Sequence, residues 1–412
     1  MKKKRNMILG FLLLLGLFAG ICVQAEEAQV TGAEEYKIGV AVYDPESSEM
    51  NMFINYYRDY LEEGFPVKFY FSGKINSVEG ENEFIRAVKA QGAQGVISFL
   101  GMDVKETIRV CEENEMYYVL GSNSISDADY EAVKDNPWFL GTIGPDPEAV
   151  HQAGRDMADY FLKKDGKSFL IMSGGASRGS SMHALRTQGM LEVLQEQAGL
   201  ILPEEAEAVA VVDENTTLTN SDGTVSVTIC PDYTEGGEGL ANLESAFADA
   251  TYDVLMSAFH ASTYLDKIAE KENTQGSNIM VGAIDSFTEQ NFEIFKERDA
   301  FGNAPIDYVQ GKYASMAGPA FAMVYNAITG HPEANTSDGE AVRLYQGFWK
   351  ADNRESYIEL YGYTTGIYEN AYSCDSLMQV IKVFNDDASP EKLKELTEAY
   401  TVEDVKARIL GE

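Results

Sequence analysis

The sequence predicts an α/β fold with doubly wound parallel sheets, and three observations indicate it. Apolar runs of strand length alternate with amphipathic stretches of helical length, which is the pattern of βαβ units whose sheet is covered on both faces. Of the 412 residues, 45% are hydrophobic, enough to fill proper cores. No linker rich in Pro, Gly or Ser divides the chain, so segments should cross between two parts of one body.

The first alternating series begins near residue 36. We expect its strands at residues 36–43, 67–71, 95–100 and 117–121, and its helices at residues 50–63, 82–91 and 104–114. Gly64 follows the first of these helices. A left-handed cap suits glycine at that place, so the sequence predicts a helix end there.

A second series begins with a strand expected at residues 138–143, and the short boundary at residues 145–147 follows that strand. We expect its strands at 138–143, 168–173, 225–230, 254–258, 279–284 and 306–310, and its helices at 148–164, 181–197, 237–248, 262–270 and 288–298. Residues 209–230 predict a hairpin with Asp222-Gly223 at its turn. Residues 371–412 carry helical periodicity and a Ser389-Pro390 helix start, which predicts an appended helical segment.

The first 25 residues are typical of a secretory signal peptide. Three lysines and Arg5 precede an apolar run over residues 7–23, and the run ends at a small-x-small site before Glu26. Cleavage after Ala25 would leave 412 − 25 = 387 residues that act outside the cytoplasm, in a periplasm or at the outer face of the cell membrane. A permanent anchor is the alternative, but 17 residues is at the short limit for a span and no basic flank follows. Cys22 leaves a lipid anchor open, although Ile21 is larger than the residue that usually precedes a lipidated cysteine.

Charge excludes one class of partner. The formal net charge is −34, and loss of the four basic residues of the signal makes it −38, so the chain repels nucleic acid and anionic lipid surfaces. Cys111, Cys230 and Cys374 are far apart and odd in number, so their spacing defines no disulfide framework, and whether two of them pair stays open.

Metal and cofactor chemistry find no support in the motifs. The four histidines show no ligand spacing, and the chain has no C-x-x-C, no P-loop and no complete G-x-G-x-x-G. We therefore expect neither a metal nor a cofactor.

One motif favours an enzyme instead. Residues 175–179 fit G-x-S-x-G with Ser177 as the nucleophile, after an expected strand and before an expected helix. Asp232 with His260, or Asp285 with His331, would complete the chain order of a secreted serine hydrolase. Against this interpretation, the polar loop is longer than a tight nucleophile elbow and no His-Gly-Gly segment precedes it. We regard hydrolysis as the minor alternative.

From about residue 36 to residue 370 the chain resembles the type I periplasmic sugar-binding proteins, which share their fold with the ligand-binding part of lactose-repressor-type regulators. The resemblance depends on the order and spacing of several segments, none diagnostic alone: YKIGVAVYD (36–44), FLGTIGPDPEAVHQAGRDMADYF (139–161), LRTQGMLEVL (185–194), YDVLMSAFHA (252–261), IMVGAIDSF (279–287) and YVQGKYASMAGPAFAMVYNAITG (308–330). A signal segment stands in place of a DNA-binding headpiece, which argues against a repressor.

The resemblance implies two lobes that three crossovers join and that close around a ligand by hinge motion. It assigns residues 36–146 with 313–345 to the N-terminal lobe and residues 147–312 with 346–370 to the C-terminal lobe. Residues 371–412 remain as the C-terminal helical extension.

The resemblance also implies a ligand pocket. Met52, Phe53 and Tyr233 match residues that cover the two faces of a sugar ring. Arg186, Asp285 and Gln310 match side chains that bind its hydroxyl rim, and Arg186 has the planar fork that suits two adjacent hydroxyls. Where many sugar binders carry Asp-Arg after the fourth strand, this chain has Ser122-Asn123, and where they carry Asn-Asp after the strand at 254–258 it has Phe259-His260, so the identity of the ligand stays open.

We therefore expect a non-enzymatic solute-binding protein, acting as a monomer, that captures a small polar ligand such as a sugar for an importer of the ATP-binding-cassette type. The alternative is a binding protein of the same kind that docks on a membrane sensor kinase or chemoreceptor. The sequence does not separate the two outputs, because both depend on a difference in ligand affinity between open and closed states.

Overall fold

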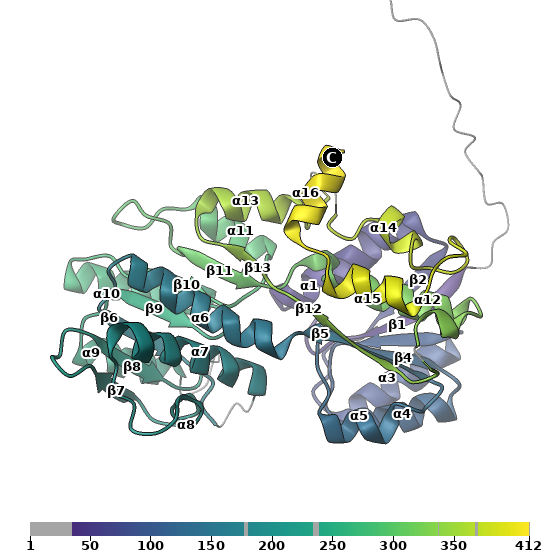
Figure 1. Cartoon of the computed structure of the whole chain (residues 1–412), viewed down its shortest axis with the longest axis horizontal. Helices are drawn as coiled ribbons and strands as arrows, with labels where there is room; N and C mark the ends of the chain where they lie inside the picture. The colour runs from purple at the N-terminus through teal and green to yellow at the C-terminus, as the bar shows by residue number, and fades with distance from the viewer. Residues whose placement is uncertain (1–34, 177–179, 234–238, 337, 367–369, 412) are drawn as a thin grey trace, which may run out of the picture. The chain divides into compact units, whose positions relative to one another are not determined.

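The structure is a computed structural model, and it describes residues 35–176, 180–233, 239–336, 338–366 and 370–411. Two sheets dominated by parallel strands form separate layers, and helices cover both of them (Figure 1). The predicted α/β class with two doubly wound lobes is confirmed.

The first sheet has six strands in the order β12-β5-β4-β3-β1-β2, and every pair in it is parallel. Its strands are continuous buried runs because helices cover both faces. Their bounds are β1 (Tyr36–Ala41), β2 (Val67–Phe71), β3 (Gly95–Ser98), β4 (Tyr117–Gly121), β5 (Phe139–Pro145) and β12 (Val342–Gln346).

The second sheet has seven strands in the order β13-β11-β10-β9-β6-β8-β7, and only its two edge strands run antiparallel to their neighbours. The edge pair β7 and β8 is the predicted hairpin, and Gly223 takes φ +72° in its turn, as the Asp-Gly signal requires. The bounds are β6 (Ser168–Met172), β7 (Thr216–Thr219), β8 (Ser226–Cys230), β9 (Val254–Ser257), β10 (Met280–Ala283), β11 (Tyr308–Gly311) and β13 (Trp349–Ala351).

Helices cover both sheets. With the first sheet, forming the first lobe, lie α1 (Ser48–Asn55), the π-helix η1 (Tyr56–Leu61), α2 (Glu62–Gly64), α3 (Val78–Ala90), α4 (Val104–Glu113), α5 (Asp127–Val133) and α12 (Gly318–Ile328). With the second sheet, forming the second lobe, lie α6 (Pro147–Lys163), α7 (Ser181–Ala198), α8 (Ala206–Val209), α9 (Gly239–Asp249), α10 (Leu265–Gln275), α11 (Glu289–Lys296) and α13 (Arg354–Gly362). The 3-10 turns are η2 (Ser262–Tyr264), η3 (Ala314–Ala317) and η4 (Pro332–Ala334).

The chain passes between the two sheets three times. The crossings follow β5, β11 and β12, in agreement with the three-strand hinge that the resemblance implies. The predicted signal peptide, residues 1–25 with Cys22, lies outside the described residues. Within the described part of the chain, no helix has the length and apolarity that a membrane crossing requires.

The prediction of a left-handed cap at Gly64 is wrong. The first helix does end at Gly64, but this glycine is absent from the residues with positive φ, so it forms no left-handed cap. A Cβ atom at Gly64 would lie 2.2 Å from Cys374 Sγ. A side chain at position 64 would therefore displace Cys374 of the C-terminal segment.

The C-terminal extension packs on the first lobe and explains why α12 is buried on every side. Its helices are α14 (Cys374–Met378), α15 (Pro390–Glu398) and α16 (Val402–Leu410). Both α14 and α15 contact α12, and α15 also contacts the edge strand β12. All eleven residues of α12 are buried, as expected of a helix that is apolar all round.

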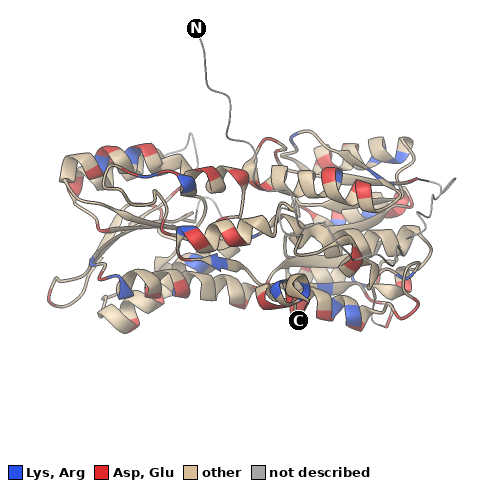
Figure 2. Cartoon of the chain, turned by 90° about the horizontal axis from the view of Figure 1, so that it is seen from above, with Lys and Arg blue, Asp and Glu red and all other residues tan. Residues whose placement is uncertain are grey.

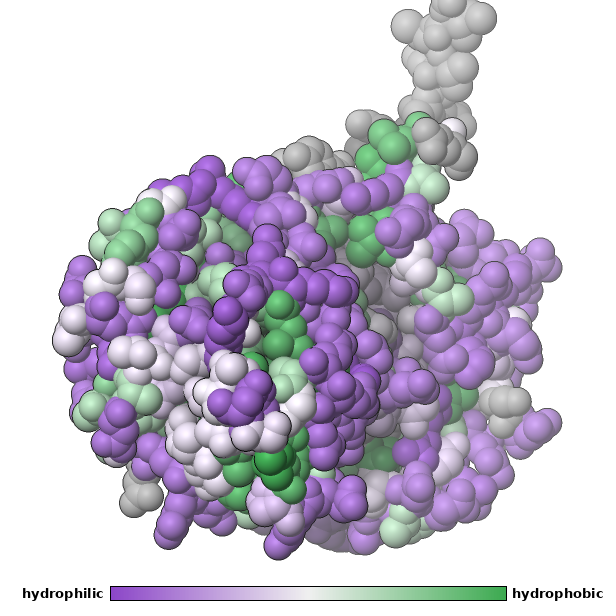
Figure 3. All heavy atoms as spheres, turned by 60° about the vertical axis from the view of Figure 1, so that its left-hand side comes forward, coloured by the Kyte–Doolittle hydropathy of each residue, from purple (hydrophilic) through white to green (hydrophobic). Residues whose placement is uncertain are grey.

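Charged residues lie mostly on the helices and loops of both lobes (Figure 2). The face at the end of the second lobe is mainly hydrophilic, and its hydrophobic residues form small groups (Figure 3). Cys111, Cys230 and Cys374 are all free thiols, so the described cysteines form no pair.

Candidate ligand-binding site

Residues at the carboxyl ends of strands in both sheets line one cavity of about 270 Å³. Ligands of open α/β sheets bind at such strand ends, so this cavity is the candidate site. The first lobe contributes Tyr43, Glu49, Met50, Phe99, Leu100, Ser122, Asn123, Ser124 and Pro145. The second lobe contributes Ser180, Met182, His183, Arg186, Phe259 and Lys312.

A larger groove of about 810 Å³ lies between α1 with its π-helical continuation and the α11 and α13 region. Two buried polar atoms without a protein partner, Ser122 Oγ and Arg186 Nε, belong to residues of the smaller cavity. Among the described residues that line the larger groove, none has such an atom. Because buried polar atoms need partners, the smaller cavity is the stronger candidate for a site that takes a polar ligand.

Arg186 is a buried cation on α7. It is 5% exposed, and its Nη1 donates to the carbonyl oxygens of Ala258 at 2.8 Å and Ile284 at 3.1 Å. These carbonyls follow β9 and β10. Among the described residues no carboxylate lies within 4.0 Å of the guanidinium. Burial lowers the pKa of Arg186 to about 10, so the side chain stays charged at neutral pH.

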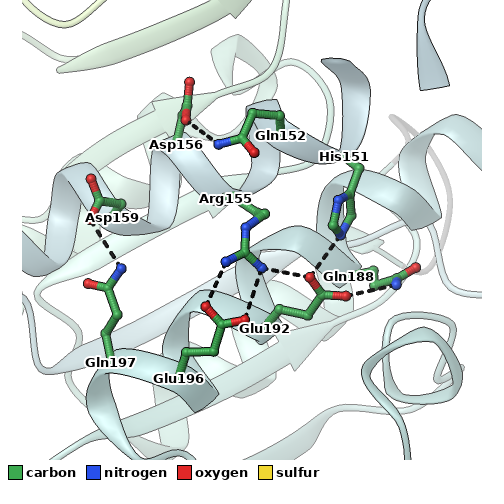
Figure 4. A network of polar contacts seen from close by, with 9 residues as sticks. All are labelled: His151, Gln152, Arg155, Asp156, Asp159, Gln188, Glu192, Glu196 and Gln197. Carbon is green, nitrogen blue, oxygen red and sulfur yellow. Dashed lines mark hydrogen bonds and ion pairs between the residues drawn. The ribbon is translucent and has the colours of Figure 1, made fainter. Parts of the chain in front are cut away.

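The position of Arg186 depends on close packing between α6 and α7. A Cβ atom at Gly154 would lie 2.0 Å from the carbonyl oxygen of Arg186, so only glycine permits this approach. Beside it, Arg155 of α6 donates to Glu192 at 2.7 Å and to Glu196 at 2.6 Å on α7 (Figure 4). The two helices are thus held together by close backbone packing at Gly154 and by the charged network around Arg155.

Aromatic rings form a wall next to Arg186. His183 stacks on Phe259 with a centroid distance of 5.0 Å, and its Nδ1 shares a hydrogen bond with the hydroxyl of Tyr233. Burial, with the charges of Arg186 and Lys312, holds the pKa of His183 well below its usual range. His183 is therefore neutral at neutral pH and offers a flat, uncharged face. Tyr233 supports this wall from behind and does not line the cavity.

Ser122 and Asn123 occupy the opposite side, after β4. Ser122 has φ +53°, a left-handed conformation that is uncommon outside glycine, and its Oγ is buried without a partner. Asn123 Nδ2 donates to the carbonyl of Leu100 at 3.0 Å, and its Oδ1 accepts from the backbone N–H of Ser124 at 2.9 Å. Asn123 thus shapes the loop, and Ser122 is available to a ligand.

The two predicted ring-covering residues of α1 lie elsewhere. Phe53 is 0% exposed and stacks on Phe99 with a centroid distance of 4.9 Å, so Phe99 and not Phe53 reaches the cavity. Met52 lines the larger groove. On an amphipathic helix, neighbouring residues point in different directions, and these two point into the core and the groove.

Asp285, Gln310 and His260 are near the cavity but do not line it. Asp285 accepts a hydrogen bond from Asn291 Nδ2 at 2.8 Å, and burial raises the pKa of its carboxyl. Gln310 accepts from the hydroxyl of Tyr308. The ring of His260 lies against Phe259, 4.4 Å between centroids. Of the ten predicted site residues, Ser122, Asn123, Arg186 and Phe259 come together at the cavity.

Sequence reasoning missed Glu49, His183 and Lys312. His183 lies three residues before Arg186 on α7, and that helical spacing places two side chains on one face. Lys312 directly follows β11, so its place at the carboxyl end of a strand was the available signal. Glu49 is in the first turn of α1 and gave no comparable signal.

Ser177, the candidate nucleophile of the hydrolase alternative, lies outside the described residues. His331, one of its suggested histidines, lies after α12 in the first lobe, where its Nδ1 is 3.2 Å from Glu333 Oε1. Residues that the structure describes form no group of three or more His, Cys, Asp or Glu side chains able to hold a metal ion.

No family model matches the chain, and no curated protein matches it with a significant score. Solved structures do match. A periplasmic solute-binding protein of an ABC transporter from Actinobacillus succinogenes, with bound D-allose, has a TM-score of 0.56 at 10% identity, covering 79% of this chain and 99% of that one. A galactofuranose-binding protein has a TM-score of 0.55 at 14% identity, covering 80% and 99%.

A third structure is an ABC transporter solute-binding protein from Bacillus halodurans with bound myo-inositol. Its TM-score is 0.54 at 14% identity, and the match covers 81% of this chain and 99% of that one. The described chain therefore has the two-lobed fold of the type I periplasmic binding proteins, as the resemblance implied. Since one fold can serve several functions, the function must be argued from the site.

Proposed function

We propose that this chain is an extracytoplasmic solute-binding protein that captures a sugar or a similarly small polar ligand and presents it to an importer of the ATP-binding-cassette type. The observation that carries the proposal is Arg186, a buried charge with an unpartnered Nε at an interlobe cavity. A buried donor without a partner costs about 1–3 kcal/mol, and a ligand acceptor removes that cost.

The cavity offers the two surfaces that a sugar needs. The stacked rings of His183 and Phe259 give a flat apolar face, against which the C–H face of a sugar ring packs. Arg186 presents a planar fork that can bind two adjacent oxygen atoms. Binding between two lobes that a hinge connects would favour closure, which is the state that a membrane partner can recognise.

The comparisons support a binding role. Two of the similar structures hold D-allose and myo-inositol, and the third is named as a galactofuranose-binding protein. All three ligands are ring compounds rich in hydroxyls. Together with the predicted export of the chain, this favours capture outside the cytoplasm without chemistry on the ligand.

A thermal-shift screen tests the proposal. Residues 26–412 are mixed with monosaccharides, oligosaccharides, inositols, nucleosides and amino acids. A ligand at a hundred times its Kd adds about 2.7 kcal/mol of stability, so a binder raises the melting temperature clearly. Arg186→Gln should abolish the shift. Arg109→Gln is the matched control, because Arg109 lies on the exposed face of α4 with Glu106 and Glu113. A shift that survives Arg186→Gln contradicts the site.

The location is tested separately. The exported protein should begin at Glu26, which N-terminal sequencing or intact mass measurement of the extracytoplasmic fraction shows. Recovery of the full chain from Met1 in the cytoplasm alone would contradict export.

A further inference from the structure

The wall of the candidate cavity holds hydrogen-bond donors that the protein itself does not use. Arg186 Nε has no partner, and its hydrogen bonds to described residues all come from Nη1. Lys312 has three donor hydrogens and uses one for Glu49. The carboxylate and amide oxygens on the wall, those of Glu49 and Asn123, already accept hydrogen bonds from the protein. A ligand rich in acceptors would fit this wall.

Charge points the same way. The ionised side chains that line the cavity are Arg186 and Lys312 against Glu49, and Glu49 is already paired with Lys312 at 2.8 Å. His183 is neutral. Arg186 is left as a buried charge without a counter-ion within ion-pair distance among the described residues. Glu49 and Asp285 lie near enough to favour the charged form of Arg186, but among the described residues neither carboxylate reaches ion-pair distance of the guanidinium. An isolated buried cation is costly unless an anion pairs with it.

The volume of the cavity limits the ligand to about the size of one sugar ring. The cavity of about 270 Å³ is below the range of about 300–1,000 Å³ that is typical of sites for drug-sized molecules. The stacked pair of His183 and Phe259 gives one flat wall, beside Arg186.

We infer that the ligand is a monosaccharide-sized sugar acid, whose carboxylate pairs with the free edge of the Arg186 guanidinium while its ring packs on His183 and Phe259. The inference rests on the proposed function and narrows its substrate class. A carboxylate matches the fork of arginine with two parallel hydrogen bonds, and such charge-assisted pairs are about twice as strong as neutral ones.

Isothermal titration with matched ligands tests the inference. The probes are D-galacturonate, its methyl ester and D-galactose, and the same three compounds of the gluco series. Within each series only the group at C6 changes. We expect the acid of one series to bind at least tenfold more tightly than its ester and its parent sugar.

Arg186→Gln should bring the ratio of acid to ester affinity close to one, whereas Arg109→Gln should leave it unchanged. If Arg186→Gln fails to fold, Lys312→Gln removes the second cation and should lower the ratio at least threefold.

Each outcome decides something. Equal binding of acid, ester and parent sugar overturns the sugar-acid inference and leaves sugar binding intact. Binding of another neutral ligand from the thermal-shift screen, with no binding of either acid, has the same meaning. If neither the acids nor any compound of that screen binds, the proposed function fails as well.

Discussion

Glu49 and Lys312 form an ion pair that joins the two lobes, with Lys312 Nζ 2.8 Å from Glu49 Oε1. Glu49 lies in the first turn of α1 of the first lobe, and Lys312 follows β11 of the second. Their side chains are 14% and 16% exposed, and both line the candidate cavity. The pair therefore connects the state of the cavity with the spacing of the lobes, because a change in lobe separation must lengthen or break it.

Loss of this pair should favour an open arrangement of the ligand-free protein. Glu49→Gln removes the charge and keeps the size of the side chain. We expect a loss of about 1 kcal/mol, the upper end for partly exposed pairs, which shifts the balance of closed to open forms about fivefold. Small-angle scattering should show a larger radius of gyration. Lys163→Gln breaks an exposed pair within α6 and should leave the radius unchanged. An unchanged radius in Glu49→Gln would mean that the pair does not hold the lobes.

Gly154→Ala should weaken the fold and the candidate site together. The added Cβ atom would lie 2.0 Å from the carbonyl oxygen of Arg186, so α6 and α7 must separate. Overpacking of this kind costs about 1–3 kcal/mol, measured by urea unfolding, and displacement of Arg186 should weaken ligand binding. At Gly73 a Cβ atom meets nothing within 4 Å, so Gly73→Ala is the control and should change neither quantity. Wild-type stability in Gly154→Ala would show that the helices adjust without cost.

The sequence alone predicts the strand order along the chain better than the direction of side chains at strand ends. Alternation of apolar runs and helical stretches places nearly every strand, because burial in a parallel sheet leaves a continuous apolar signal. Asp285 follows β10 and Gln310 lies near the end of β11, as expected. Their side chains bind Asn291 and Tyr308 instead of facing the cavity, and such local partners leave no periodic signal in a sequence.

The residues that line the cavity could be predicted only in part, because some of them meet only across the two lobes. Arg186 stood out as a planar donor on the helix that follows a loop at the carboxyl edge of the sheet. Glu49 and Lys312 meet only when the two lobes are assembled, at a separation of 263 residues. Contacts of this kind depend on the angle between the lobes, and single-chain periodicity does not encode that angle.

Deprotonation of Asp307 should lower the free energy of unfolding as pH rises from about 4 to about 6. Burial raises the pKa of Asp307 to about 6, from an ordinary value of 3.8, while its Oδ2 accepts from the backbone N–H of Val281 at 2.8 Å. The folded state thus holds this proton more tightly than the unfolded state, so its contribution is complete below pH 4 and lost above pH 6. Each pKa unit is worth about 1.4 kcal/mol, so the loss amounts to at most about 3 kcal/mol.

Asp307→Asn removes this titration and keeps the acceptor oxygen. The difference in unfolding free energy between variant and wild type, from urea titrations at pH 4, 5, 6 and 7, should move in favour of the variant as pH rises. The value at pH 4 serves as the internal control for effects unrelated to charge. A difference independent of pH would refute the role of Asp307.

Arg408 should anchor the last helix to the segment that enters the C-terminal extension. Its Nη1 donates to Ser373 Oγ at 2.6 Å, its Nη2 to the carbonyl of Asn370 at 2.8 Å, and its Nε to the hydroxyl of Tyr400 at 3.1 Å. A hydrogen bond that involves a charged group contributes about 1.5–3 kcal/mol. Because the Arg408 side chain is only half-buried, we expect these three hydrogen bonds together to contribute about 2 kcal/mol to the free energy of unfolding.

Arg408→Gln should therefore lower the free energy of urea unfolding by about 2 kcal/mol and expose α16 to limited proteolysis. Ligand affinity should stay unchanged, because Arg408 does not line the cavity. Lys394→Gln, which breaks an exposed pair on α15, is the control and should behave as wild type. If both variants resist proteolysis equally, α16 is held by its apolar contacts through Val405, which is fully buried, and not by Arg408.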